Sequence, residues 1–244
     1  MDDQLGGGNM NAVRRVGDTV VRNAGPWTPT IHRFLVFLDA AGIDGIPRPV
    51  SIGRDREVLS FVAGEVPVYP LPEWVWSDEV LVDAAHRLRS LHDASVGFDV
   101  RDAIWQVPSH PPIEVICHND FAPHNLAFEN GRVVGAIDFD TCSPGSRMWD
   151  IAYLATRIVP LTAELPAGAP REGQSRRQIQ LLLDSYGCDE DWTDVVRMAI
   201  LRLHDLATFS IGKASELAKP HLRADAAGYE RDAAHLMGVL DALG

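Results

Sequence analysis

Cysteine is scarce in this sequence, and long apolar runs are missing from it. Three cysteines, at positions 117, 142 and 188, occur among 244 residues, and none of them belongs to a C-x-x-C pair, which argues against a disulfide framework. No stretch approaches the roughly 18 apolar residues that indicate a membrane-spanning helix. The acidic first residues also lack the basic and then apolar order of a secretory signal. We therefore expect a cytoplasmic protein that does not associate with the membrane.

Positive charge is also in short supply. The chain has 22 Lys and Arg against 34 Asp and Glu, which gives a formal net charge of -12. Nucleic acids and anionic membranes bind basic surfaces, so both are disfavoured as partners. An acidic surface attracts cationic small molecules, although acidic charge also serves solubility alone. The sequence does not indicate an oligomeric state.

The chain is long enough to bury a full core, and we expect an α+β fold of two unequal lobes, since 46% of the residues are hydrophobic. Apolar patterns bounded by turn residues predict strands at 12–16, 19–22, 47–53, 57–62 and 113–117. Helical spacing predicts helices at 28–42, from Ser77 onward, and at 178–186, 194–211 and 225–243. In the first helix Thr28 is the expected cap and Gly42 the expected end.

The most informative segment is His-Asn-Asp-Phe-Ala-Pro-His-Asn at 118–125, followed by Ile-Asp-Phe-Asp at 137–140. Asn130-Gly131 between two apolar runs predicts a β-hairpin that brings Asp138 back towards the loop with Asp120 and Asn125. Two carboxylates and an amide oxygen would then converge. Hard oxygen ligands of this kind suit Mg²⁺, which takes the rest of its shell from water and substrate phosphates.

The five-residue step from Asp120 to Asn125 matches the catalytic-loop spacing of kinases. With the following Ile-Asp pair and Met-Trp-Asp-Ile-Ala at 148–152, the chain resembles the aminoglycoside phosphotransferase family, the small-molecule relatives of protein kinases. The resemblance is sharpest at 115–155. It implies a protein-kinase-like, two-lobed fold, with a small β-rich N-lobe at 1–62, a hinge or linker at 63–72 and a mostly helical C-lobe at 73–244.

The resemblance assigns roles around the catalytic loop. Asp120 should orient or deprotonate an acceptor hydroxyl, while Asn125 and Asp138 should hold Mg²⁺ that bridges the nucleotide phosphates. His118 should be structural. Asp150 should brace the loop, and its alternative is to cap a helix that begins there.

Two other residues of the motif have more than one interpretation. His124 either approaches the acceptor or is a structural histidine, and the structural role is the commoner one for a histidine. Asp140 either contacts a second metal or the acceptor, or is a solvated loop acid.

The same resemblance places the nucleotide, ATP or GTP, against the first 62 residues. Gly7, Gly8 and Asn9 lie in a glycine-rich segment that should cover the phosphates. Arg22 stands where the family has a phosphate-binding lysine, and its planar fork also binds phosphate oxygens. Backbone groups of Ser60, Phe61 and Val62 should bind the adenine edge.

One family feature is missing. Kinases pair the strand lysine with a glutamate on the following helix, but no Glu occurs between residues 30 and 42. His32 is the polar residue nearest the expected position. Asp39 lies too near the far end of the helix to substitute for the glutamate. The site is therefore either rewired or weakened, and we favour rewiring because the catalytic loop is complete.

The expected reaction is transfer of a nucleotide's γ-phosphoryl group to a hydroxyl of a small molecule, such as an aminoglycoside, another amine or a sugar, with antibiotic resistance as one setting. The resemblance places the acceptor between the catalytic loop and the last helices. Candidate acids for binding it are Asp184, Asp189, Glu190, Asp191 and Asp205.

Two alternatives stand beside this interpretation. A metal-dependent phosphoester hydrolase would use His118, Asp120, His124 and Asp138 as ligands, but it gives no role to Asn125. A catalytically weak nucleotide-binding module would follow from Arg22 and the missing helix glutamate.

Overall fold

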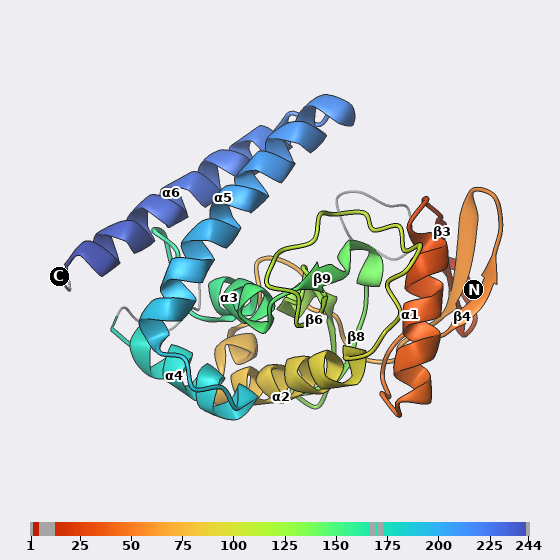
Figure 1. Cartoon of the computed structure of the whole chain (residues 1–244), viewed down its shortest axis with the longest axis horizontal. Coiled ribbons are helices and arrows are strands. Elements are labelled where there is room, and N and C mark those ends of the chain that lie inside the picture. The colour runs from red at the N-terminus through yellow and green to blue at the C-terminus, as the bar shows by residue number, and fades with distance from the viewer. Residues whose placement is uncertain (1, 5–12, 166–168, 170–172, 243–244) are drawn as a thin grey trace.

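The structure, a computed structural model, describes residues 2–4, 13–165, 169 and 173–242. The first lobe is an antiparallel five-stranded sheet in the order β1-β2-β3-β5-β4, joined by the helix α1 (Figure 1). Its elements are β1 (Asp2–Gln4), β2 (Arg14–Val16), β3 (Thr19–Asn23), α1 (Thr28–Ala40), β4 (Pro49–Ile52) and β5 (Arg56–Ser60). The four strands and the helix expected in this lobe are confirmed, and β1 is a strand that was not expected.

Helix α1 buries one apolar stripe. Ile31, Phe34, Leu35 and Leu38 recur at intervals of three and one residues along the helix and are all nearly inaccessible to solvent. The expectation that Thr28 caps this helix is wrong. A tight turn from residue 25 starts the helix one residue earlier, so Thr28 is already helical and its Oγ1 accepts a hydrogen bond from the Gly25 amide at 2.9 Å.

The middle of the chain forms two small sheets. The predicted hairpin is confirmed as β7 (Leu126–Glu129) and β8 (Arg132–Ala136). Asn130 and Gly131 have φ of 51° and 76°, the left-handed conformations that a two-residue hairpin turn of this type requires. The second sheet pairs the predicted strand β6 (Val115–Cys117) with β9 (Ser143–Gly145), which was not anticipated.

The second lobe is mostly helical. Its helices are α2 (Asp78–Ser95), α3 (Arg147–Ile158), α4 (Ser175–Tyr186), α5 (Trp192–Glu216) and α6 (His221–Asp241). Helices α5 and α6 lie side by side and project away from the body of the molecule (Figure 1). Among the described helices, none combines the length and apolarity needed to cross a membrane.

Two glycines allow the lobes to approach each other closely. Gly45, in the loop after α1, accepts a hydrogen bond of 2.9 Å from the Ala136 amide of β8. A Cβ on Gly135 would lie 2.6 Å from the Gly45 carbonyl oxygen, so a larger residue at either position would separate the backbones. The small sheet lobe and helical lobe confirm the expected fold class. The boundaries at 62 and 72 stay a prediction.

Candidate active site

Backbone hydrogen bonds tie the loop 118–125 to the turn that follows the hairpin. The Ile137 amide donates to the Asn125 carbonyl at 2.9 Å, and His118 Nε2 lies 3.0 Å from the Ile137 carbonyl. Thr141 Oγ1 also donates to the His118 carbonyl at 2.9 Å. The hairpin therefore returns Asp138 to the catalytic loop, as the sequence predicted.

Asp120 is held by three side chains. Asn125 donates its amide to Asp120 Oδ2 at 2.8 Å, and the Tyr153 hydroxyl donates to Oδ1. His124 Nε2 lies 3.5 Å from the same Oδ1. Burial raises the pKa of Asp120, but His124 and the Tyr153 hydroxyl outweigh it and lower the pKa to about 2. The carboxylate is therefore ionised and fixed in direction at neutral pH.

The two histidines of the loop lie in different surroundings. His118 is buried, the Asp120 amide donates to its Nδ1 at 3.3 Å, and its Nε2 lies 3.0 Å from the Ile137 carbonyl, so both ring nitrogens contact the backbone. His124 is 31% exposed beside Asp120, and its ring centroid lies 5.6 Å from that of Tyr69. The sequence left both roles of His124 open, and both remain predictions for this partly exposed ring.

Asp138 and Asp140 share one arginine. Arg22, on β3, donates to Asp138 Oδ1 at 2.8 Å and to Asp140 Oδ1 at 2.6 Å. Asp138 has φ of 61°, and its side chain is 42% exposed. Asp140 is buried, so the interpretation as a solvated loop acid is wrong. Burial raises the pKa of Asp140 to about 6; Arg22 acts against this shift, and the charge of Asp138 adds to it.

The missing helix glutamate has a replacement on β5. Glu57 is fully buried and accepts a hydrogen bond from Arg22 Nε at 2.8 Å, while its other oxygen lies 2.7 Å from His32 Nε2 on α1. The helix therefore connects to the strand cation through His32 and Glu57. Asp39 instead pairs with Arg48 at 2.7 Å, in an exposed position. Glu57 was missed in the sequence, and the interpretation of a rewired nucleotide site stays a prediction.

Arg22 is thus surrounded by carboxylates. It is 7% exposed and contacts three acids, Glu57, Asp138 and Asp140. Burial lowers the pKa of Arg22, but the three negative charges outweigh burial and raise it. A buried cation so well compensated orders the acids that face it.

Asp150 holds the start of the catalytic loop. Its Oδ2 accepts from the His118 amide at 2.5 Å and its Oδ1 from the Asn119 amide at 2.8 Å. His92 Nε2, on α2, lies 3.1 Å from Oδ2. Burial raises the pKa of Asp150, but the hydrogen bond and charge of His92 outweigh it and lower the pKa. The alternative of helix capping is wrong, because Ser146 caps α3 by accepting from the Trp149 amide.

Arg202, on α5, connects the catalytic loop to one of the candidate acids. It donates to the Asn119 carbonyl and pairs with Asp205 at 2.9 Å. Among the other candidates, Asp191 caps α5 and Asp184 accepts from Gln180 on its own helix. No sequence signal pointed to Arg202 or Tyr153, because each reaches the loop only through the packing of its helix against it.

Two of the three residues expected at the adenine edge have their amides in backbone hydrogen bonds. The Ser60 amide donates to the Arg48 carbonyl at 2.8 Å, and the Phe61 amide donates to the Asp18 carbonyl at 2.9 Å. The contact of these three residues with adenine stays a prediction. Gly7, Gly8 and Asn9 lie outside the described residues.

The ligand set of the hydrolase alternative is not assembled. In the part of the chain that the structure describes, the one group of three or more His, Cys, Asp or Glu close enough to share a metal is His92, Cys117 and Asp150. All three are buried, and both oxygens of Asp150 hold loop amides. His118, Asp120, His124 and Asp138 do not form such a group.

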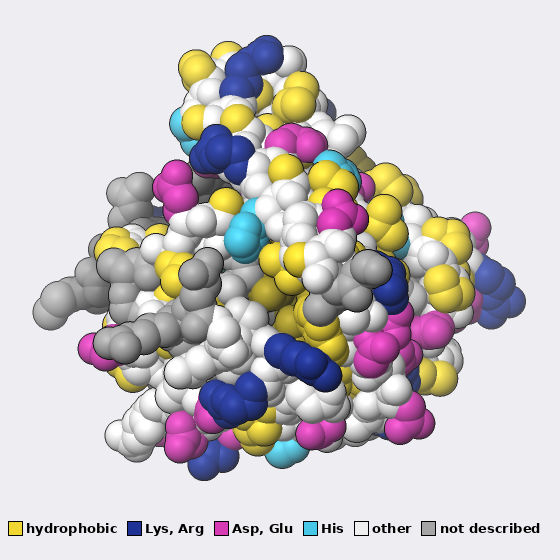
Figure 2. Space-filling model, turned by 90° about the vertical axis from the view of Figure 1, so that its left-hand side faces the viewer, with side chains coloured by type: hydrophobic (Ala, Val, Ile, Leu, Met, Phe, Trp, Pro, Cys, Tyr) yellow, Lys and Arg dark blue, Asp and Glu magenta, His cyan; other side chains and the backbone are white. Residues whose placement is uncertain are grey.

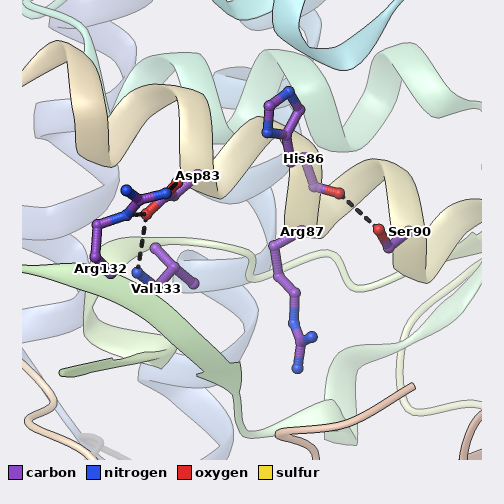
Figure 3. Close-up of a pocket in the computed structure, with 6 residues that line it drawn as sticks. All are labelled: Asp83, His86, Arg87, Ser90, Arg132 and Val133. Atoms are coloured by element: carbon purple, nitrogen blue, oxygen red, sulfur yellow. Dashed lines mark hydrogen bonds and ion pairs between the residues drawn. The ribbon is translucent and has the colours of Figure 1, made fainter. Parts of the chain in front are cut away.

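Two surface features lie outside this constellation. A pocket of about 360 Å³ between α2 and β8 is bounded by the Asp83–Arg132 pair, at 2.6 Å, and by Arg87 (Figure 3). None of its lining residues belongs to the catalytic loop. On the face that carries the projecting helices, acidic and basic side chains are interspersed, so the net charge does not gather there in one acidic field (Figure 2).

Solved structures share this fold along nearly the whole chain. A choline/ethanolamine kinase family protein from Mesorhizobium loti aligns with a TM-score of 0.70 and 18% identity over 97% of this chain and 88% of its own. An ethanolamine kinase from Plasmodium vivax aligns with a TM-score of 0.69 and 13% identity over 96% of this chain and 81% of its own. ADP-bound aminoglycoside phosphotransferase APH(2'')-Ib aligns with a TM-score of 0.60 and 17% identity over 97% of this chain and 94% of its own. The fold is therefore that of the kinase-like enzymes that phosphorylate small molecules.

Sequence comparison gives the family. Residues 74–182 match the model of the phosphotransferase enzyme family, APH. The chain is 31% identical over 232 residues to the Trifolitoxin immunity protein of Rhizobium leguminosarum bv. trifolii. The alignment covers 90% of this chain and 85% of that protein. The chain belongs to the phosphotransferase enzyme family, as the resemblance indicated, and its class is that of a small-molecule kinase.

Proposed function

We propose that this protein transfers the γ-phosphoryl group of ATP or GTP to a hydroxyl group of a small molecule, with Asp120 facing the hydroxyl. The observation that carries the proposal is the fixed carboxylate of Asp120, held by Asn125 and Tyr153 in a loop that is bonded to the Asp138 turn. Phosphoryl transfer depends mainly on positioning and on stabilisation of charge, and a fixed acceptor-facing acid supplies the first of these.

In this proposal Asp120 accepts the hydrogen bond of the acceptor hydroxyl. The hydroxyl oxygen forms a bond to the γ-phosphorus while the bond from that phosphorus to the bridging oxygen breaks, and the nucleoside diphosphate leaves. With a pKa of about 2, Asp120 is a weak base. It therefore orients the hydroxyl first, and it takes the proton only as the new bond forms.

The residues proposed for Mg²⁺ have suitable donor atoms. Asn125 directs its amide hydrogens to Asp120, so its Oδ1 lies on the other side of the amide group. Asp138 is partly exposed, and Arg22 engages its Oδ1. Carboxylate and amide oxygens are ligands that Mg²⁺ accepts. When bound, the ion would neutralise negative charge on the nucleotide phosphates.

Arg22, on the nucleotide side of the site, differs from a free phosphate-binding lysine because its side chain already binds acids of this chain. Its Nη1 and Nη2 already bind Asp138 and Asp140. We therefore propose that Arg22 mainly orders these two acids, and that a phosphate oxygen would have to compete with Asp138 for Nη1. Buried Asp140 lies with Arg22 rather than with His124, so we place it on the metal side of the site and not on the acceptor side.

The relatives suggest acceptor classes to screen. Solved neighbours include a complex with GDP and kanamycin and a ternary complex with streptomycin and ATP. The name of the 31% identical relative ties that protein to immunity against a toxin. We propose that the phosphorylated compound is itself toxic and that its phosphorylation protects the cell.

The test is a screen of hydroxyl compounds, including antibiotics, sugars and amines, with Mg²⁺ and either ATP or GTP. We expect mass spectrometry to detect at least one compound that gains a phosphoryl group while one equivalent of nucleoside diphosphate appears. Nucleotide hydrolysis that is independent of every hydroxyl compound, or release of phosphate from phosphomonoesters without nucleotide, would contradict the proposal.

A further inference from the structure

Arg157 packs against the tyrosine that holds Asp120. It follows Tyr153 by four residues on α3, about 6 Å along the helix axis, and Tyr153 donates its hydroxyl hydrogen to Asp120. The guanidinium carbon of Arg157 lies 4.9 Å from the centroid of the Tyr153 ring and 5.3 Å from that of Tyr229, on α6. One aromatic ring therefore links this cation to the acid that orients the hydroxyl.

The charge of Arg157 has no acidic partner in the described part of the chain. No ion pair of 4.0 Å or shorter is found for it there, and the groups that raise its pKa against burial are three tyrosines, Tyr153, Tyr229 and Tyr69. Its Nη2 donates to the Tyr229 hydroxyl at 3.3 Å, and its buried Nε has no partner. A guanidinium offers five donors, and buried charges are usually paired.

A second arginine at the same ring shows the contrast. The guanidinium carbon of Arg202 lies 4.8 Å from the Tyr153 centroid. Arg202, however, pairs with Asp205 at 2.9 Å and donates to the Asn119 carbonyl. The chain itself therefore compensates the charge of Arg202, whereas the described residues supply no acidic partner for Arg157.

The side chains around Asp120 are partly exposed to solvent. The side chains of Asp120 and His124 are 32% and 31% exposed, and Tyr69 stands at their edge with 55% exposure. The ring centroid of Tyr69 lies 5.6 Å from that of His124, so this exposed tyrosine stands at the edge of the Asp120 site.

We propose that Arg157 binds an anionic group, a carboxylate or a phosphate, on the same molecule whose hydroxyl Asp120 orients. This inference rests on the proposed phosphoryl transfer and narrows its acceptor to hydroxyl compounds with a negative charge. An anion completes the hydrogen bonds of the guanidinium fork and compensates its charge, which neutral sugars and polycationic aminoglycosides do not do.

The experiment uses sets of hydroxyl compounds that share a scaffold and carry different charges. One set contains glucose, glucosamine, glucuronate and glucose 6-phosphate, which are the neutral, amine, carboxylate and phosphate forms. Further hydroxyl scaffolds are tested in the same four forms, and kanamycin serves as the polycation. Turnover with ATP or GTP and thermal stabilisation without nucleotide are measured for the full chain. The variants are Arg157→Gln, Arg157→Lys and, as a matched control, Arg197→Gln, which removes an exposed arginine paired with Asp194.

We expect the carboxylate or the phosphate form of a scaffold to be a better acceptor and stabiliser than its neutral and amine forms. Comparing the carboxylate form with the phosphate form shows which anion the site prefers. Arg157→Gln should raise KM for the anionic form by about 10-fold to 100-fold, the range for a hydrogen bond to a charged group. Arg157→Lys should recover part of that loss, and Arg197→Gln should change nothing. Circular dichroism and the melting temperature establish that each variant is folded.

Failure of this inference is distinguishable from failure of the proposed function. Preferred turnover of neutral or cationic compounds, or equal KM values in wild type and Arg157→Gln, would overturn the anion site and leave the kinase intact. Stabilisation by anions that depends on Arg157, without phosphorylation of any compound, would support the anion site and contradict the kinase. Equal or absent stabilisation by all members of every set would overturn the anion site.

Discussion

Arg22 and Glu57 face each other across two adjacent antiparallel strands, and Arg22 Nε donates a hydrogen bond of 2.8 Å to Glu57 Oε1. The other oxygen of Glu57 reaches His32 on α1. A strand acid and a helix histidine thus take the place of the helix glutamate that kinases use, and they orient the arginine that holds Asp138.

Replacing Glu57 should therefore affect both stability and nucleotide binding. Glu57→Gln removes a buried charge from the Arg22 network, and we expect a loss of about 1–3 kcal/mol in the free energy of unfolding, together with weaker Mg-ATP binding. Urea unfolding and calorimetry measure the two effects. The matched control is Asp39→Asn, in the exposed pair with Arg48, which should cost less than about 1 kcal/mol. Equal losses for the two variants would contradict this role of Glu57.

Asp138 is the proposed metal ligand whose change is easiest to separate from folding. Asp138→Asn keeps the shape of the side chain but removes its charge, so we expect Mg-nucleotide affinity to fall about 10-fold or more, which corresponds to about 1.4 kcal/mol. Titration of nucleotide at several Mg²⁺ concentrations measures this. Asp184→Asn, at an exposed position on α4, serves as the control. Unchanged Mg²⁺ dependence would remove Asp138 from the site.

Asp150 should stabilise the fold in a pH-dependent way. Its folded-state pKa lies below its ordinary value of 3.8, so its contribution is fully present above about pH 4 and is lost as the pH falls towards and through the folded-state pKa. Asp150→Asn lacks this contribution at every pH. We expect it to be less stable than wild type by about 3–5 kcal/mol at pH 7.

The difference between these two proteins should shrink below pH 4. Denaturant unfolding at a series of pH values measures it, with the exposed variant Asp189→Asn as the control. A difference that stays constant down to the lowest accessible pH would show that the ionised form of Asp150 is not what holds the loop.

Tyr153 should affect catalysis more than acceptor binding. Tyr153→Phe removes the hydroxyl that donates to Asp120 but keeps the ring that packs against both arginines. We expect kcat to fall by about 10-fold, the effect of one hydrogen bond of about 1.4 kcal/mol, with little change in KM for the acceptor. A change confined to KM would place Tyr153 in acceptor binding instead.

Local signals in the sequence were sufficient for much of the fold. The Ser77 hydroxyl accepts from the Val80 amide and caps α2 as expected. Asn130-Gly131 forms the hairpin turn, and Gly187 ends α4 with φ of 79°. Each of these features depends on a few neighbouring residues, and the sequence states them directly.

Features that depend on distant residues were not predictable in this way. Glu57 reads as an ordinary strand residue until the register of β3 and β5 places it opposite Arg22. Strand β9, Ser-Pro-Gly at 143–145, has little strand propensity and forms through its pairing with β6. Tyr153 reaches Asp120 only through the packing of α3, so the sequence yielded the acid itself but not the hydroxyl that holds it.

The central claim is that Asp120 faces the acceptor hydroxyl during phosphoryl transfer. The most direct measurement compares wild type and Asp120→Asn in two assays, phosphorylated product by mass spectrometry with the acceptor that the screen identifies, and Mg-nucleotide affinity by calorimetry. We predict that product formation falls by about 10²-fold to 10⁴-fold, while nucleotide affinity changes by less than about 2-fold, or 0.4 kcal/mol. Product formation at the wild-type rate in Asp120→Asn would contradict the account.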